Sequence, residues 1–112
     1  MGKISKNNLF SDIPTSLEQE WFQTLLSNAT VKIERIVSKG QCSPPGFWYD
    51  QGWDEWVVLL KGSAALQFEG DSEEMALGPG DAVLIPAGAR HRVTRTADKV
   101  ETVWLAVHIL GQ

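Results

Sequence analysis

The segment from Gly80 to His91 places the strongest constraint on how this chain can fold. Gly80 lets the chain turn into the apolar run at 82–85, and Pro86 ends a strand there because proline has no amide hydrogen to donate to a sheet. Gly88 then permits a sharp reversal, since glycine adopts backbone angles that other residues avoid. The segment therefore predicts a strand, a tight reversal, and a histidine carried into the next strand.

From residue 31 onward, short apolar runs alternate with turn signals at intervals of about 8–12 residues. Val31, Ile33 and Val37 alternate with polar neighbours, as in a strand with one buried face. Many short antiparallel strands leave unpaired edges unless the sheet closes, which predicts an all-β protein with two packed sheets. The expected strands lie near residues 31–37, 47–49, 55–60, 64–68, 73–77, 82–85, 90–95 and 100–109.

The first 30 residues have a different pattern. Residues 15–18 have the form of a helix capping box, with Pro14 directly before it. Leu17, Trp21 and Leu25 then repeat at helical spacing. We therefore expect an N-terminal arm and one short helix within residues 1–30, packed outside a β-barrel formed by residues 31–112.

Composition limits the classes of partner. The net charge of -4 argues against nucleic acid or an anionic membrane surface, and no apolar run approaches the roughly 20 residues that span a bilayer. Residues 1–10 lack the apolar core of a secretory signal, and the single cysteine, Cys42, cannot form an internal disulfide. We therefore expect a cytoplasmic protein that acts on neither nucleic acid nor membrane.

Two spacings resemble the signature motifs of the cupin superfamily. Residues 80–91 match the pattern G-x5-P-x-G-x2-H, and Glu55 and Gly62 match E-x6-G. The resemblance covers about residues 31–109 and implies a jelly-roll barrel, also called a double-stranded β-helix, with His91 directed into its lumen. Segments 47–51, 55–57 and 104–108 look like those of small single-domain bacterial cupins of unassigned activity.

The first cupin motif is incomplete in this chain. Metal-binding cupins normally carry an H-x-H pair three or four residues before the glutamate. Here those positions hold Trp48 and Asp50, or Tyr49 and Gln51, so neither register supplies a histidine pair.

Four residues remain as candidate metal ligands. Oxygen donors together with one imidazole suit a divalent ion such as Mn, Fe, Ni or Zn. A second interpretation stays open, in which the carboxylate and the imidazole form a hydrogen-bonded pair without a metal. The candidate ligands are Asp50, Gln51, Glu55 and His91.

His108 is expected to lie outside the lumen. Val103, Leu105, Val107 and Ile109 form a uniformly apolar face of the last strand, and His108 lies on the opposite face. If the apolar face fills the core, the histidine points away from it.

Four further residues are candidates for ligand binding: Trp48, Tyr49, Trp56 and Arg95. The aromatic side chains flank the first motif and could line an apolar cavity, although core packing or a subunit interface explains them equally well. Arg95 shares strand parity with His91, so it is expected either at the pocket mouth holding an anionic group or on a solvated surface.

Two classes of function follow. In the first, the chain is a small isomerase, lyase or dioxygenase in which Glu55 and His91 are catalytic, as base, ligand or proton shuttle. In the second, the barrel binds or senses a small organic molecule without turning it over. Both faces of residues 56–60 are apolar, so we also expect a homodimer.

Overall fold

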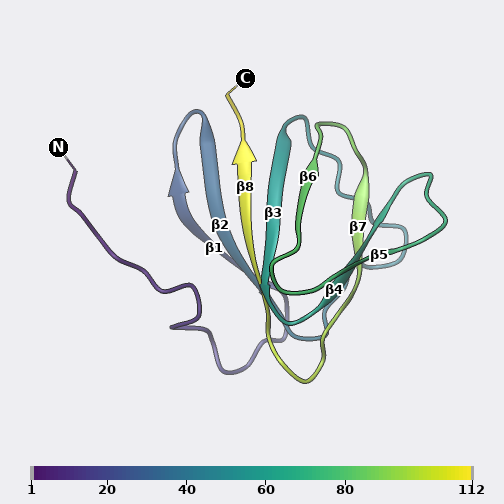
Figure 1. Cartoon of the computed structure of the whole chain (residues 1–112), viewed down its shortest axis with the longest axis horizontal. Coiled ribbons are helices and arrows are strands. Elements are labelled where there is room, and N and C mark those ends of the chain that lie inside the picture. Colours follow the sequence, from purple (N-terminus) through teal and green to yellow (C-terminus); the bar gives the residue numbers. More distant parts are fainter. Residues whose placement is uncertain (1, 112) are drawn as a thin grey trace.

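The computed structural model describes residues 2–111, which form two antiparallel β-sheets and no helix. The larger sheet has the order β1-β2-β8-β3-β6 and the smaller has the order β5-β4-β7. Figure 1 shows the two sheets facing each other and spreading apart toward one end. The predicted all-β, two-sheet architecture is confirmed. The strands are β1 (Trp21–Ser27), β2 (Val31–Ser38), β3 (Asp54–Lys61), β4 (Ala64–Phe68), β5 (Met75–Leu77), β6 (Ala82–Ile85), β7 (His91–Thr96) and β8 (Thr102–Ile109).

The space between the sheets has an apolar end and a polar end. On neighbouring strands β3 and β8, Leu59 lies opposite Trp104 at one end, whereas Glu55 lies opposite His108 at the other. Because side chains alternate between the faces of a strand, all four belong to the inner face. The buried core cluster gathers around the first pair and consists of Val57, Leu59, Ala64, Leu66, Leu77, Ile85, Trp104 and Ala106.

The predicted N-terminal helix is wrong, because Trp21–Ser27 forms strand β1. A spacing of four residues, as from Trp21 to Leu25, places side chains on one face of a strand as well as of a helix. Pairing with β2 satisfies the backbone of this segment. Asn28 ends the strand, since its side-chain oxygen accepts hydrogen bonds from the backbone amides of Thr30 and Val31, both at 2.9 Å, and so shapes the hairpin turn.

The N-terminal arm crosses the outer face of the larger sheet. Arg35 is 3% exposed and donates from Nη1 to the carbonyl oxygens of Leu9 and Ser11, at 3.1 and 2.7 Å. Its guanidinium also lies 5.0 Å from the ring centroid of Trp21. These two hydrogen bonds pair part of the buried guanidinium with backbone oxygens of the arm, so Arg35 ties the arm to β2.

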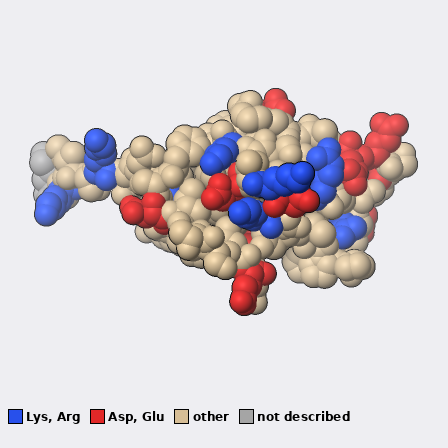
Figure 2. Space-filling view, turned by 90° about the horizontal axis from the view of Figure 1, so that it is seen from below, with Lys and Arg blue, Asp and Glu red and all other residues tan. Residues whose placement is uncertain are grey.

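Surface charges are mixed on the face drawn in Figure 2, where Lys and Arg lie among Asp and Glu. A broad basic patch of the kind that binds nucleic acid is absent from that face. The described residues contain no helix long and apolar enough to cross a membrane.

Two motif glycines have positive φ for different local reasons. Gly88 has a φ of 80°, as its predicted reversal requires, and a β-carbon added there would meet nothing within 4 Å. Gly62 has a φ of 89°, and an added β-carbon would lie 2.7 Å from the α-carbon of Thr102. Glycine at position 62 therefore permits a close approach of β8 as well as a left-handed backbone.

We expect Gly62→Ala to destabilise the protein more than Gly88→Ala. The second change should cost about 1–2 kcal/mol in the free energy of unfolding, from backbone strain alone. The first adds a clash with backbone atoms, worth a further ~1–3 kcal/mol. Urea unfolding of both variants checks the order, and equal costs would contradict the role assigned to the close approach.

Candidate functional site

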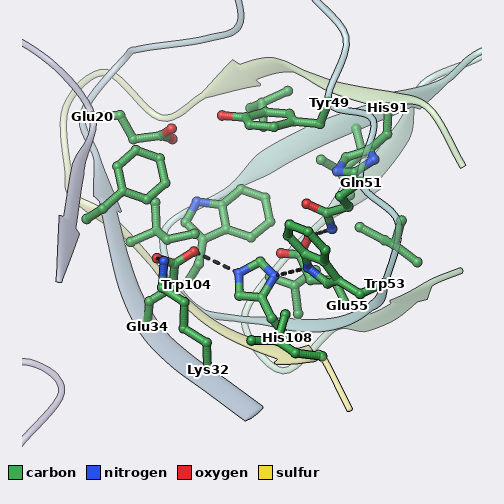
Figure 3. Close-up of a pocket in the computed structure, with 17 residues that line it drawn as sticks. Glu20, Lys32, Glu34, Tyr49, Gln51, Trp53, Glu55, His91, Trp104 and His108 are labelled. Atoms are coloured by element: carbon green, nitrogen blue, oxygen red, sulfur yellow. Dashed lines mark hydrogen bonds and ion pairs between the residues drawn. The ribbon is translucent and has the colours of Figure 1, made fainter. Parts of the chain in front are cut away.

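A cavity of about 670 Å³ opens at the polar end between the sheets. Its volume lies within the range of about 300–1,000 Å³ typical of small-molecule sites. Figure 3 shows side chains from both sheets and from the 49–53 segment directed into it. The polar lining consists of Glu20, Lys32, Glu34, Tyr49, Gln51, Glu55, His91 and His108, and the aromatic walls include Phe22, Trp53 and Trp104.

A hydrogen-bond chain crosses the floor of this cavity, from Trp53 through His108 to Glu34 (Figure 3). The indole nitrogen of Trp53 lies 2.9 Å from Nδ1 of His108, and Nε2 of His108 lies 2.8 Å from Glu34 Oε1. An indole N–H can only donate, so Nδ1 accepts and carries no proton. Nε2 therefore carries the hydrogen and donates to Glu34, and both ring nitrogens are engaged.

This hydrogen-bond chain shifts the pKa values of Glu34 and His108. The hydrogen bond from His108 holds the pKa of the Glu34 carboxyl below its usual range, and the same bond raises the pKa of His108. Trp53 opposes protonation of His108, because a protonated Nδ1 could no longer accept the indole hydrogen. Lys32 adds a cation 3.7 Å from Glu34 at the more exposed edge of the site.

Gln51 and Glu55 form a second polar pair on the wall. Gln51 Nε2 donates to Glu55 Oε1 at 2.7 Å, and Glu55 is 8% exposed. The backbone carbonyl of Gln51 accepts from the amide of Gly88 at 2.8 Å. The reversal in the second motif thus fixes the loop that carries Gln51 beside the glutamate.

His91 enters the cavity from the smaller sheet. Its backbone exchanges two hydrogen bonds with Tyr49, at 2.7 and 3.1 Å, and the two rings stack with centroids 5.4 Å apart. Nδ1 lies 2.9 Å from the carbonyl oxygen of Ala89, which can only accept, so Nδ1 carries the hydrogen. In the neutral ring, Nε2 is then left with a free lone pair, and no described residue hydrogen-bonds to it.

Tyr49 and Glu20 face each other at one side of the cavity (Figure 3). Burial, followed by the negative charges of Glu20, Glu55 and Glu34, raises the pKa of Tyr49 to about 12, so its hydroxyl stays protonated. Burial also raises the pKa of Glu20, although a 2.7 Å hydrogen bond from Ser38 Oγ acts in the opposite direction.

Three predicted site residues lie outside the cavity lining. Asp50 is exposed and lies 3.8 Å from Arg90, whose guanidinium is also 5.9 Å from the ring of Trp48. Trp56 is 40% exposed and lies on the outer face of β3, opposite Val107. Trp56 directly follows Glu55 in the chain, and the alternation of a strand directs the two to opposite faces.

Arg95 is also directed away from the cavity and lies on the solvated surface, the second of its two expected positions. The pairing of β4 with β7 shifts register between Ala65 and Leu66, where Thr94 is bypassed. Such a bulge reverses the alternation of side chains, so Arg95 and His91 end on different faces. Arg95 instead lies 3.8 Å from Glu74 at the surface.

The expected outward position of His108 is wrong. His108, Ala106 and Trp104 face inward, whereas the uniformly apolar face with Leu105 and Val107 lies on the outside of the larger sheet. Both faces of β8 are rich in apolar residues, so hydrophobicity did not distinguish them. Trp104, on the same face as the histidine, was the signal that could have indicated the buried side.

The cavity does not fit a metal ion. Among residues 2–111, no group of three or more His, Cys, Asp or Glu side chains is placed to hold one. Both nitrogens of His108 are hydrogen-bonded, and Asp50 points to the surface. Of the four predicted ligands, Gln51, Glu55 and His91 line the cavity, but the glutamine amide nitrogen already faces one glutamate oxygen.

Comparison with known protein families identifies the family of this chain. The family model of a Cupin domain matches residues 34–108. A search of curated proteins finds no match. A solved structure from Ralstonia eutropha JMP134, whose proposed activity is that of a mannose-6-phosphate isomerase, is 50% identical with a TM-score of 0.91, covering 95% of this chain and 98% of that one.

Two more distant structures share the fold. A cupin superfamily protein from Desulfitobacterium hafniense DCB-2 is 19% identical with a TM-score of 0.71, covering 88% of this chain and 84% of that one. An RmlC-like cupin from Desulfovibrio desulfuricans is 16% identical with a TM-score of 0.78, covering 98% and 100%.

The hydrogen-bond chain predicts opposite effects of its two ends on His108. Trp53→Phe should raise the pKa of His108, because the donor that opposes protonation of Nδ1 is lost. Glu34→Gln should lower it, because the anion that stabilises the imidazolium is lost. NMR titration of the His108 ring resonances in the two variants and in the natural chain measures both. A lower pKa in Trp53→Phe would contradict the tautomer assigned here.

Proposed function

The chain belongs to the Cupin domain family, and from this premise we propose that its cavity binds a small, partly apolar organic molecule without the help of a metal ion. The observation that carries the proposal is the cavity itself, about 670 Å³ in volume, with aromatic walls and a few convergent polar groups. This combination is typical of small-molecule sites.

Three polar groups are free to orient such a ligand. Nε2 of His91 has a lone pair, the Tyr49 hydroxyl remains protonated, and one oxygen of Glu55 is not used by Gln51. Together they offer a donor and acceptors from two opposite walls, since Glu55 lies on β3 and His91 on β7. An apolar body would pack against the aromatic walls.

An isomerase is the second candidate, favoured by the 50% identity to the Ralstonia protein. Moving a proton between adjacent carbons needs a base within reach of both, and Glu55 with His91 could share that work. A sugar phosphate fits the cavity poorly, however. Its dianion would meet the carboxyl groups of Glu20, Glu34 and Glu55, while the lysine of the lining is already paired with Glu34.

Binding should depend on the cavity residues and not on metal. Any compound that a thermal-shift screen identifies should bind His91→Ala and Tyr49→Ala at least about tenfold more weakly, equal to ~1.4 kcal/mol. Arg95→Ala is the matched control and should bind normally. Elemental analysis of untagged protein should find far less than one metal ion per chain, and EDTA should not change the affinity.

Two outcomes would overturn this proposal. Stoichiometric metal whose removal abolishes binding would restore a metal-dependent site. Conversion of mannose 6-phosphate to fructose 6-phosphate, lost in Glu55→Gln, would establish the isomerase instead. Proton NMR of the sugar phosphates follows that reaction directly.

We also propose that two copies of the chain pair through the outer face of the larger sheet. Trp56 is 40% exposed and Leu84 is 59% exposed, and they are cross-strand partners on β3 and β6. Ile33, Leu105 and Val107 continue this face across β2 and β8. Soluble monomers rarely expose a contiguous apolar surface of this kind.

Trp56→Glu should therefore weaken the dimer, because a charge would be buried at its interface. Sedimentation equilibrium should show a dimer for the natural chain at tens of micromolar, within the range of specific interfaces, and a monomer for the variant. Met75→Glu is the control, since Met75 is 43% exposed but lies on β5 of the other sheet. A monomeric natural chain would contradict the proposal.

A further inference from the structure

We infer that the cavity selects an organic cation: a molecule with an ammonium group on a partly apolar body. This inference rests on the proposed binding function and names the chemical class of the ligand. It follows from the balance of charge in the lining, from the aromatic surfaces around it and from an unused hydrogen-bond donor in its wall.

The lining carries more negative than positive groups. Glu20, Glu34 and Glu55 face the cavity, against Lys32 as its one lysine or arginine. Lys32 lies 3.7 Å from Glu34, which also accepts the hydrogen bond from His108. The one lysine and the imidazole N–H of the lining are therefore both directed to a single carboxylate.

The other two carboxyl groups have neutral partners. Glu20 accepts from the hydroxyl of Ser38 at 2.7 Å, and Glu55 accepts from the amide of Gln51 at 2.7 Å. No lysine, arginine or histidine of residues 2–111 forms an ion pair with either one. A buried carboxylate is costly without a positive partner, and a cationic ligand would supply it.

Tyr49 lies close enough to these carboxyl groups for their charges to affect its pKa. Burial first, and then the charges of Glu20, Glu55 and Glu34, raise the pKa of its hydroxyl and keep it protonated. Its ring, which stacks on His91, therefore stays neutral in a negative environment. Ammonium groups bind well against the faces of such rings, and Trp53, Trp104 and Phe22 extend the aromatic lining.

The wall also contains an unsatisfied donor. Trp104 lines the cavity and is 4% exposed, and its indole N–H has no hydrogen-bond partner among the described residues. Buried donors in native proteins are almost always paired. A ligand that carries an acceptor oxygen near its ammonium group would satisfy this donor, whereas a simple alkylamine would not.

A matched pair of probes separates charge from shape. Acetylcholine and 3,3-dimethylbutyl acetate share the same outline and the same ester oxygens, but only the first carries a positive charge. Isothermal titration calorimetry with the full chain should show acetylcholine binding at least about tenfold more tightly than the neutral ester. Acetylcholine serves here as a probe for organic cations as a chemical class.

Isosteric variants test the two carboxyl groups. Glu20→Gln and Glu55→Gln should each weaken acetylcholine binding about fivefold or more, because one negative charge is lost, and should leave binding of the neutral ester unchanged. Glu74→Gln is the control, since Glu74 pairs with Arg95 on the outer surface. Thermal unfolding of each variant confirms that it is folded before titration.

The dependence on pH provides a test on the natural chain. Glu20 has a raised pKa, so acetylcholine affinity should increase as pH rises and this group ionises. The other titratable groups around the cavity are Lys32, Glu34, Glu55, His91 and His108. Tyr49 stays neutral near neutral pH, since its pKa is about 12. All of them are retained in Glu20→Gln, so the difference between the two pH profiles isolates Glu20.

The outcomes are distinguishable. Equal affinity for acetylcholine and the neutral ester, both lost in Tyr49→Ala, would overturn the selection of cations and leave the binding function in place. Preference for neutral mannose or for mannose 6-phosphate would also overturn it. If neither probe nor any compound of the wider screen binds, both the inference and the proposed function fail.

Discussion

The hydrogen-bond chain from Trp53 through His108 to Glu34 is the interaction on which the chemistry of this cavity depends. It joins three neighbouring parts of the larger sheet: the start of β3, strand β8 and strand β2. Because both nitrogens of His108 are used, the histidine is held in one tautomer and is not available to a metal. The same hydrogen bonds direct the imidazole N–H of His108 to Glu34, so neither Glu20 nor Glu55 accepts it.

The position of the cavity follows from how the barrel is filled. Leucine, tryptophan and alanine side chains close one end of the space between the sheets, where Leu59 and Ala64 are completely buried. Toward the other end, the inner positions of β3 and β8 are Glu55 and His108. Packing of the apolar end stabilises the fold, since each buried leucine contributes roughly 1.5–3 kcal/mol. The polar end is thus free to remain open.

The sequence predicted those features that local backbone chemistry determines. The 80–91 segment was predictable because proline and glycine restrict the backbone in known ways, and Gly88 has the expected positive φ. The N-terminal strand was missed because a four-residue spacing fits helix and strand alike. The choice between the two expected positions of Arg95 could not be predicted, because the bulge at Thr94 depends on pairing with β4, which one strand's pattern does not contain. His108 was misplaced because both faces of β8 are apolar.

Burial of Glu20 without a positive partner has a cost that the fold itself does not offset. Placing a carboxyl group in such a site disfavours its charged form, and the raised pKa of Glu20 expresses this cost. The hydroxyl of Ser38 compensates only in part, because it carries no charge. If the missing charge arrives with the ligand, the same free energy that opposes ionisation in the empty cavity favours a cation over a neutral molecule of equal shape. The cost of burying the carboxylate is then recovered when a cation binds, and the cavity selects a cation over a neutral molecule.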